Sequence, residues 1–288
     1  MYEKLEQCPV CKHTHFINHL ICDDHSVTGE SFALVKCDKC NLIFTNPRPE
    51  KKNLAKYYSS ENYISHTDRA NSPINFIYRL VRKFTLKQKI KLVQKYKKNG
   101  TLLDYGCGTG DFLQTATKNN WQPFGYEPDL KAKKIASEKN GNQIIESINT
   151  IDKVDVVTAW HVLEHVSDLS ETVKQLRKIL VDGGHLIIAL PNHRSYDAAY
   201  YKEFWAAYDV PRHLYHFDEE AVKELARQFK FKIVKIHPMK FDSYYVSLLS
   251  EKYRKNGGII KAIKTGYLSN KSAKKTNQYS SRIYVLQK

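Results

Sequence analysis

The sequence predicts an α/β protein whose main domain is a mostly parallel sheet of seven strands with helices on both faces, preceded by a small metal-binding module. From Thr101 onward, short apolar runs alternate with helical stretches, which is typical of parallel sheets. Two Cys-x-x-Cys pairs lie within the first 48 residues, a spacing typical of a metal site. The length of 288 residues is enough for one sizeable core and one small module.

The composition is that of a globular protein, since 42% of the residues are hydrophobic and 26% are charged. No stretch approaches the roughly 18 continuous apolar residues that a membrane span needs. The first residues, "MYEKLEQCPVC", lack the apolar run of a signal peptide. We therefore expect a cytoplasmic protein without a transmembrane segment, in whose reducing surroundings metal binding is favoured over disulfides for its six cysteines.

The net charge of +16 is unevenly distributed along the chain. Residues 69–103 and residues 252–288 each contain ten lysines or arginines and no acidic residue. A positive field attracts nucleic acid, nucleotide-linked substrates or an acidic membrane surface. The alternative is that these lysines form a solvated surface that binds no partner. Few aromatic residues interrupt the C-terminal run, which weakens the prediction of nucleic-acid binding.

Residues 1–48 are predicted to form a zinc ribbon. Thiolates at positions i and i+3 of a tight turn reach one ion together, and zinc prefers four tetrahedral ligands. Because thiolates fill all four positions, the predicted site is structural, and its binding energy is also folding energy for so small a module. Cys22 has no partner at this spacing, and the nearby histidines are not needed to complete the set. The predicted ligands of Zn²⁺ are Cys8, Cys11, Cys37 and Cys40.

The remaining elements follow from patterning. Prolines in "NPRP" end the module; residues 49–100 are predicted to be a linker and a basic helical segment, and residues 101–288 the main domain. Residues 192–217 are expected to form a lid, and residues 241–279 an insertion with one helix and a mobile Gly-, Ser- and Lys-rich stretch. Asp218 is the expected cap of the helix "DEEAVKELARQF". The expected strands are "TLLDY", "QPFGYE", "NQIIES", "VDVVTAW", "GHLIIAL", "FKIVKIHPM" and "SRIYVLQK".

The strongest functional signal is "LLDYGCGTGDF", residues 102–112. An apolar strand ends at Asp104, and three glycines at alternate positions then form a tight turn into a helix. Glycines let the backbone approach a ligand closely, and the N-terminus of the helix offers free N–H groups. Because a glycine motif alone also suits a dinucleotide, a dinucleotide-dependent oxidoreductase is the alternative at this point.

The motif and its context resemble the S-adenosylmethionine-dependent methyltransferases of the Rossmann-like class. Their first motif, D-x-G-x-G-x-G, is matched by Asp104 and the three glycines, and the acid that holds the ribose hydroxyls in this family is matched by Glu127. The segments "VDVVTAWHVLEHV" and "LVDGGHLIIALPN" match the fourth and fifth strands. The resemblance implies a Rossmann-like methyltransferase sheet with an antiparallel last strand. It also implies cofactor contacts from Asp104, Gly106, Cys107, Gly108, Gly110, Glu127, Ser147, Trp160 and His161.

Histidines are the predicted catalytic residues. Methyl transfer depends largely on positioning, but an oxygen nucleophile usually needs a base, and histidine titrates near neutral pH. His213 lies in the expected lid, beyond the strand ends where ligands bind in α/β sheets, and is predicted to face the acceptor, with Arg212 beside it. His161 is the second candidate, since it shares a face with Glu164 and His165 if their turn is helical. The alternative is that Glu164 and His165 only orient the turn.

The segments "WHVLEHV" and "PRHLYHF" resemble the ubiquinone-biosynthesis O-methyltransferases. The matching region of those enzymes can bind a divalent cation, but His161 stands here in place of an acid, which argues against magnesium. The resemblance implies methyl transfer from S-adenosylmethionine to O or N of a small or carbohydrate-linked metabolite. One alternative is an RNA methyltransferase that holds RNA with its basic surface and zinc ribbon. The other is a non-catalytic cofactor-binding protein. The acceptor and the oligomeric state are not predicted.

Overall fold

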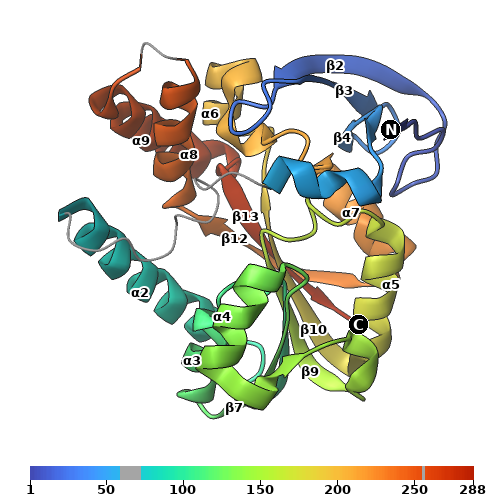
Figure 1. Cartoon of the computed structure of the whole chain (residues 1–288), viewed down its shortest axis with the longest axis vertical. Coiled ribbons are helices and arrows are strands. Elements are labelled where there is room, and N and C mark those ends of the chain that lie inside the picture. The colour runs from blue at the N-terminus through green and yellow to red at the C-terminus, as the bar shows by residue number, and fades with distance from the viewer. Residues whose placement is uncertain (59–72, 255–256) are drawn as a thin grey trace.

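The computed structural model describes residues 1–58, 73–254 and 257–288 (Figure 1). The middle of the predicted linker, residues 59–72, lies outside the described residues. Before it is the 3₁₀ helix η1 (Lys51–Tyr58), and after it is α2 (Pro73–Gln94), so the expected basic helix forms. In the described ranges, no helix is both long enough and apolar enough to cross a membrane.

The main sheet has seven strands in the order β12-β13-β10-β9-β6-β7-β8. The pairs from β10 to β8 are all parallel, whereas β13 runs antiparallel to both β10 and β12. The prediction of a mostly parallel sheet with an antiparallel last strand is therefore confirmed. The strands are β6 (Gly100–Tyr105), β7 (Trp121–Tyr126), β8 (Ile144–Ile145), β9 (Val154–Trp160), β10 (Leu180–Pro191), β12 (Lys232–Met239) and β13 (Ser281–Gln287).

Helices cover both faces of this sheet. Successive residues of a strand point to opposite faces, so the apolar strands place hydrophobic side chains on both faces, and each face needs a covering layer. Leu103, Val157 and Ile188 pack on one face, and Leu102, Val156 and Ile187 on the other. The first face is covered by α5 (Leu169–Ile179) and α7 (Glu219–Gln228), and the second by α2 and α3 (Asp111–Thr117). The shorter elements α4 (Leu130–Asn140), η2 (Gly141–Gln143) and η3 (Ile148–Thr150) lie near β7 and β8. Asp218 caps α7 as predicted, because its Oδ1 accepts a hydrogen bond from the Ala221 N–H.

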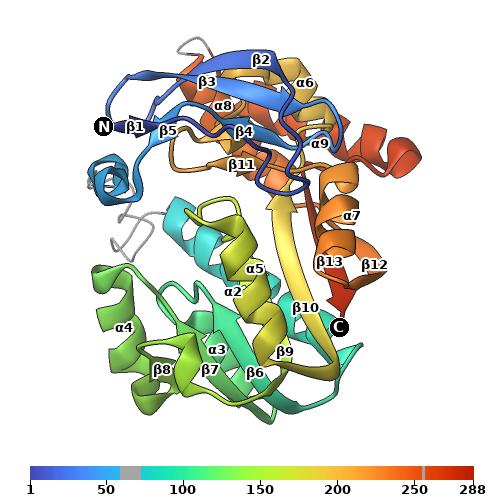
Figure 2. The ribbon, with the colours of Figure 1, turned by 90° about the vertical axis from the view of Figure 1, so that its right-hand side faces the viewer.

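The N-terminal residues form a second sheet with the order β11-β4-β3-β2, and β1 pairs separately with β5. One strand of this sheet, β11 (Tyr215–His216), comes from the far end of the chain and pairs with β4. The N-terminal sheet lies across the end of the main sheet toward which β10 runs (Figure 2). The module is therefore built into the main domain. Its own strands are β1 (Tyr2–Glu3), β2 (Phe16–Asp23), β3 (Ser31–Cys37), β4 (Ile43–Thr45) and β5 (Arg48–Pro49).

Residues 192–217, the expected lid, form α6 (Tyr196–Tyr201), η4 (Lys202–Phe204), η5 (Ala206–Tyr208) and β11. Most of their side chains are buried, so the segment is firmly anchored; that it covers the acceptor stays a prediction. The insertion folds as α8 (Asp242–Tyr253) and α9 (Ile259–Thr276), which pack together. In the stretch that was expected to be mobile, residues 259–276 form the helix α9, and residues 255–256 lie outside the described residues. Small residues of α9 allow close packing on α8, and this contact overrides the weak helical preference of Gly and Ser.

Candidate active site and metal centre

The glycine-rich turn lies between β6 and α3 and is tied to the neighbouring strand. The backbone N–H groups of Gly106 and Cys107 both donate to the Tyr126 carbonyl oxygen, at 2.7 and 3.1 Å. Gly106 has a φ of 75°, and a Cβ there would lie 2.6 Å from the side chain of Val162. Gly108 has a φ of 55°, but a Cβ there would meet nothing within 4 Å. The turn therefore needs glycine, and open space in front of Gly108 is available to a ligand.

Two carboxylates flank this turn. Glu127 follows β7, and its Oε2 accepts a hydrogen bond from the Gly108 N–H at 2.8 Å, while its Oε1 accepts one from the Asp129 N–H. Burial raises the pKa of Glu127. Asp104 is buried at the end of β6 and accepts a hydrogen bond from Thr158 Oγ1 at 2.6 Å, and burial raises its pKa to about 7. The structure thus brings the glycines, Asp104 and Glu127 together, as a cofactor site requires.

The other predicted cofactor residues lie on neighbouring strand ends. Trp160 ends β9, and its buried Nε1 has no hydrogen-bond partner among the described residues, so it is a donor available to a ligand. Ser147 caps η3 by accepting a hydrogen bond from the Asn149 N–H. Cys107 is buried, and burial raises the pKa of its thiol well above the usual range. This argues against a nucleophilic role for Cys107.

Two basic residues of α2 also contact this region, and sequence reasoning missed them. The Nζ of Lys89 lies 4.6 Å from the centroid of the Trp160 ring, and burial lowers the pKa of Lys89. Arg82 donates hydrogen bonds to Thr109 Oγ1 and to the carboxylate of Asp111, at the start of α3. The helix had been predicted only as a basic segment. The available signal was that Lys89 lies four residues before Val93, whose side chain is buried on the apolar face.

His161, the second catalytic candidate, is held between two carboxylates. Its Nδ1 lies 3.2 Å from Glu164 Oε1 and its Nε2 lies 3.0 Å from Asp242 Oδ2. Burial alone would lower the pKa of His161, but the hydrogen bonds with Asp242 and Glu164 outweigh it and raise the pKa to about 9. The ring is therefore an imidazolium at neutral pH with both N–H groups engaged, which argues against the prediction that it acts as a base. Asp242, at the start of α8, was not among the predicted residues.

His165 and His213 lie side by side, with ring centroids 4.4 Å apart. The Nδ1 of His213 lies 2.9 Å from the Ala207 carbonyl oxygen, and the Nδ1 of His165 lies 3.1 Å from the Arg212 carbonyl oxygen. Because a carbonyl only accepts, each Nδ1 carries the proton, and the Nε2 of the neutral ring is left as an acceptor. Burial, followed by the repulsion that a protonated His213 would exert, lowers the pKa of His165 to about 4.

Glu164 completes this cluster. Its side chain is fully buried, and its Oε2 has no hydrogen-bond partner among the described residues. One potential ligand atom from each of Glu164, His165 and His213 lies within 4.8 Å of the others. The structure therefore joins two predicted residues from the turn after β9 with the predicted histidine of the segment 192–217.

Arg212, which was predicted to face the acceptor beside His213, makes structural contacts instead. Its guanidinium is buried and donates to Asp24 Oδ1 at 2.8 Å, to both carboxylate oxygens of Asp209 and to the Tyr57 carbonyl oxygen. Burial alone would lower the pKa of Arg212, but the two carboxylates raise it. Arg212 is a structural ion-pair residue that links the N-terminal sheet to the segment before β11.

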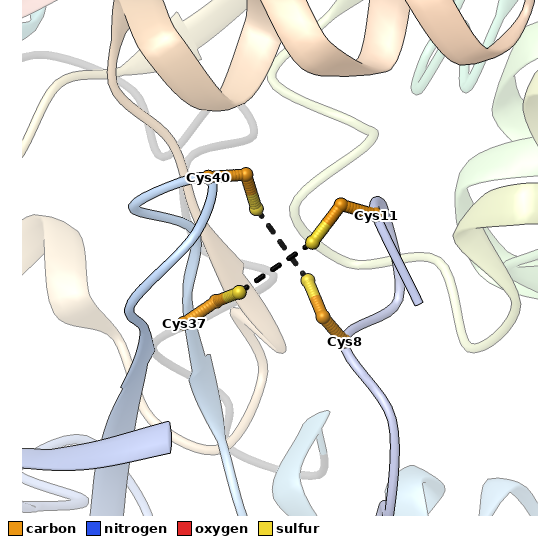
Figure 3. Close-up of side chains that lie close together, drawn as sticks. All are labelled: Cys8, Cys11, Cys37 and Cys40. Carbon is orange, nitrogen blue, oxygen red and sulfur yellow. Dashed lines mark hydrogen bonds between the residues drawn. The ribbon is translucent and has the colours of Figure 1, made fainter. Parts of the chain in front are cut away.

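The four predicted zinc ligands are buried, and their Sγ atoms point to one centre (Figure 3). The Sγ atoms of Cys8 and Cys40 are 3.5 Å apart, as are those of Cys11 and Cys37, and the four lie within 4.8 Å of one another. A tetrahedral zinc site with Zn–S bonds of about 2.3 Å has S–S edges of about 3.8 Å. All four thiols are free rather than in disulfides, so the donor set fits a structural Zn²⁺.

The two Cys-x-x-Cys turns have the same backbone geometry. The residue after each pair, Lys12 or Asn41, has a φ close to 60° and donates its N–H to the carbonyl of the first cysteine at 3.1 Å. The first turn also contacts the main domain, because Ser170 Oγ donates to the Pro9 carbonyl oxygen. The four-cysteine cluster therefore rests on the start of α5.

A family model described as a methyltransferase domain matches residues 77–236, which is more than half of the 288 residues. The fold, the glycine-rich turn and this match define an S-adenosylmethionine-dependent methyltransferase. The chain belongs to the methyltransferase-domain family. The alternative of a non-catalytic protein is not favoured.

Among curated proteins, the chain is similar to ubiquinone biosynthesis O-methyltransferases. It is 29% identical over 100 residues to the protein of Bradyrhizobium sp. (strain ORS 278), a match covering 32% of this chain and 40% of the relative. It is 28% identical over 145 residues to the protein of Nitrobacter winogradskyi, covering 45% and 54%. At most, the chain spans about half the length of these relatives.

Among solved structures, the magnesium protoporphyrin IX methyltransferase of Synechocystis PCC 6803 superimposes with a TM-score of 0.54 at 16% identity, covering 83% of this chain and 100% of that one. A SAM-dependent methyltransferase from Archaeoglobus fulgidus gives a TM-score of 0.50 at 17% identity, covering 72% and 94%. At these identities the likeness shows the fold alone.

Proposed function

We propose that this enzyme transfers the methyl group of S-adenosylmethionine to a hydroxyl oxygen of a small or carbohydrate-linked metabolite. The observation that carries the proposal is the pair His165 and His213, whose Nδ1 atoms face backbone carbonyls. In the neutral ring Nε2 is then the acceptor, and that of His213 lies 4.0 Å from Asp209 Oδ2. An oxygen nucleophile loses its proton during methylation, so a nearby neutral imidazole is suited to accept it. The O-methyltransferase relatives support oxygen as the acceptor atom. The comparisons do not favour an RNA acceptor.

In this proposal, His213 is the base and His165 maintains the cluster. His165 has a pKa lowered to about 4, which makes it a weak base at neutral pH but keeps its Nε2 unprotonated. His161, as an imidazolium between Glu164 and Asp242, fixes the turn after β9 and the start of α8. The carboxylate of Asp242 and the cation of Lys89 both lie near the turn after β9. In this proposal, these two opposite charges determine the electrostatic environment of the reacting methyl group.

Replacing His213 with asparagine is expected to lower kcat by about 10²–10⁴-fold. Asparagine retains a donor for the Ala207 carbonyl but has no proton-accepting nitrogen, so the segment keeps its anchor and loses its base. Turnover is measured with radiolabelled cofactor and a fractionated metabolite extract, and binding of S-adenosylhomocysteine by calorimetry serves as the control for folding. Unchanged turnover, or cofactor binding lost together with turnover, would contradict the assignment of a base.

The cofactor is proposed to bind along the glycine-rich turn, with its ribose at Glu127. S-adenosylmethionine carries two ribose hydroxyl donors, and Glu127 is the carboxylate that accepts a hydrogen bond from the Gly108 N–H of the turn. The methionine part would lie beside Trp160 and His161, and the adenine beside Ser147. Bound there, the cofactor supplies the activated methyl group, while these side chains orient it.

Replacing Glu127 with alanine is expected to weaken binding of S-adenosylhomocysteine by about 10–100-fold, because hydrogen bonds to a charged group contribute roughly 1.5–3 kcal/mol. Calorimetric titration gives the affinity. Glu138→Ala, at an exposed position of α4, is the matched control and should change affinity less than about twofold. Equal affinities of the two variants would exclude Glu127 as the ribose-binding residue.

A divalent cation in the Glu164, His165 and His213 cluster is a second candidate for activating the acceptor. Two imidazoles and one carboxylate suit zinc, iron or nickel better than magnesium, which agrees with the expectation drawn from His161. Such an ion would lower the pKa of an acceptor hydroxyl. The variant His165→Ala distinguishes a bound cation from a histidine base, because it removes one of the metal ligands but leaves the proposed base, His213, in place. Loss of a bound metal in His165→Ala, measured by elemental analysis, would favour the cation.

A further inference from the structure

The hairpin formed by α8 and α9 has its apolar side chains on the outside. The buried residues of α9 are small or polar, namely Ala262, Thr265, Gly266, Ser269 and Ala273. Its large apolar residues are exposed, with Ile260 at 86% and Ile259 at 66% of their maximal accessible surface. A similar pattern occurs in α8, which buries three serines and a glutamate beside the single apolar residue Val246 but exposes Tyr245 and Leu248. A helix that packs on a core normally shows the opposite pattern.

The inversion is spatially clustered rather than scattered. Single exposed apolar residues are common on protein surfaces, yet seven of the fifteen exposed large apolar side chains of the described residues lie within residues 241–267. A Cβ at Gly266 would come within 2.7–3.0 Å of Tyr244, including backbone atoms. The two helices are therefore packed closely through small residues. Their larger apolar side chains have no place in that interface and remain on the surface.

On α9 these apolar residues form a stripe beside a stripe of lysines. At about 100° per residue, Ile259, Ile263 and Tyr267 fall on one line along the helix. Lys264, Lys271 and Lys275 fall on the next line, away from the buried face, and all three are exposed. Neither α9 nor the rest of residues 252–288 contains an acidic residue. An apolar stripe flanked by lysines is typical of helices that lie in the headgroup region of a membrane.

We infer that the α8–α9 hairpin is a docking surface for an anionic lipid bilayer. The apolar stripe and the lysine stripe must be matched by one partner. RNA matches the lysines but not the isoleucines, whereas a second copy of this chain matches the isoleucines but brings its own lysines into repulsion. A bilayer with anionic headgroups matches both, since acyl chains receive the isoleucines and headgroups receive the lysines.

The docking surface is connected to the active site. The first residue of α8, Asp242, accepts the hydrogen bond from His161, and the preceding Phe241 has its ring 5.7 Å from that of Phe84 on α2. Both phenylalanines are exposed. Docking through the hairpin would therefore hold the histidine cluster near the bilayer surface. The docking inference does not depend on the proposed acceptor or base.

Vesicle co-sedimentation tests this inference. The full chain is expected to bind vesicles of equimolar phosphatidylcholine and phosphatidylglycerol, to bind phosphatidylcholine vesicles weakly, and to dissociate as salt is added. The double variant Ile259→Ser and Ile260→Ser should lower the partition coefficient at least about tenfold. The triple variant Lys264→Gln, Lys271→Gln and Lys275→Gln should lower it roughly fivefold for each charge removed.

The matched control is Leu130→Ser on α4, where an equally exposed leucine (78%) lies outside the hairpin; its partition coefficient should equal that of the unchanged chain. Failure of the unchanged chain to bind the mixed vesicles would overturn the inference. So would an unaltered partition of the isoleucine variant. A dimer that the isoleucine variant converts to monomer in sedimentation would assign the surface to a second copy. RNA binding lost only in the lysine variant would assign it to RNA.

Discussion

Replacing Cys37 with serine is expected to abolish methyl transfer and to lower the free energy of unfolding by about 5 kcal/mol or more. Structural zinc sites in small peptides contribute roughly 10–16 kcal/mol of apparent binding energy, which is also folding energy. Whole domains are stable by only about 5–15 kcal/mol. Loss of one thiolate therefore removes a term comparable to the total stability, although Cys37 belongs to neither the cofactor turn nor the histidine cluster.

The effect on catalysis follows from the connection between the two sheets. Cys37 ends β3, and the second cysteine pair leads directly into β4. The last residue of β4, Thr45, donates its N–H to the Leu214 carbonyl at 3.1 Å and its hydroxyl to the His213 carbonyl at 3.2 Å. The four-cysteine cluster thus adjoins the strand on which the backbone of His213 is anchored. If a metal holds this cluster together, its loss would remove that support from the proposed base.

Thermal unfolding, elemental analysis and turnover check this prediction together. A loss of 5 kcal/mol corresponds to a fall in the melting temperature of roughly 10–20 °C for a chain of this size. Cys22→Ala is the matched control, because Cys22 is also buried but lies outside the four-cysteine cluster, and it should cost less than about 1.5 kcal/mol. A structural zinc site would be contradicted by the following combination of results. The unchanged chain contains no metal and its four clustered cysteines react as free thiols, and the Cys37→Ser variant melts at the same temperature as the unchanged chain.

The main sheet could be predicted because its strands are signalled locally. The predicted "VDVVTAW" coincides with β9, and "TLLDY" differs from β6 by one residue, since buried parallel strands are continuous apolar runs. The glycine-rich turn and the four cysteines were also predictable, because each chemistry requires fixed residue types at a fixed short spacing. The weakest strand, β8, has only two residues, and its predicted length was too great.

What the sequence did not reveal depends on contacts between distant segments. β11 joins the N-terminal sheet by pairing with β4, about 170 residues earlier in the chain, and no local pattern signals such a pairing. Lys89 approaches Trp160, and Asp242 approaches His161, from helices that are distant from these residues in the sequence. The folding of α9 depends on packing of small residues against α8, and their composition alone predicted a mobile stretch. Local chemistry was therefore more predictable than tertiary pairing.

Replacing Arg212 with methionine is expected to lower the free energy of unfolding by about 3–5 kcal/mol, because it leaves Asp24 and Asp209 without their buried cation. The Arg212 side chain is 1% exposed and that of Asp24 is fully buried. Burial alone would raise the pKa of Asp24, but the hydrogen bond from Arg212 helps to lower it. In the variant this carboxylate must take up a proton or admit water. Since Arg212 immediately precedes His213, turnover should fall with stability.

A comparison of two arginines separates this effect from ordinary loss of a salt bridge. Arg227 on α7 makes a two-point contact with Glu224, with both donor–acceptor distances at 2.8 Å, but its side chain is 66% exposed. Exposed ion pairs contribute little to stability because water and salt screen them, so Arg227→Met should leave the midpoint of chemical denaturation almost unchanged. Adding Asp24→Asn to Arg212→Met should recover part of the loss, since it removes an unpaired buried charge. Equal stabilities of Arg212→Met and Arg227→Met would mean that Arg212 does not link the N-terminal sheet to the segment that carries His213.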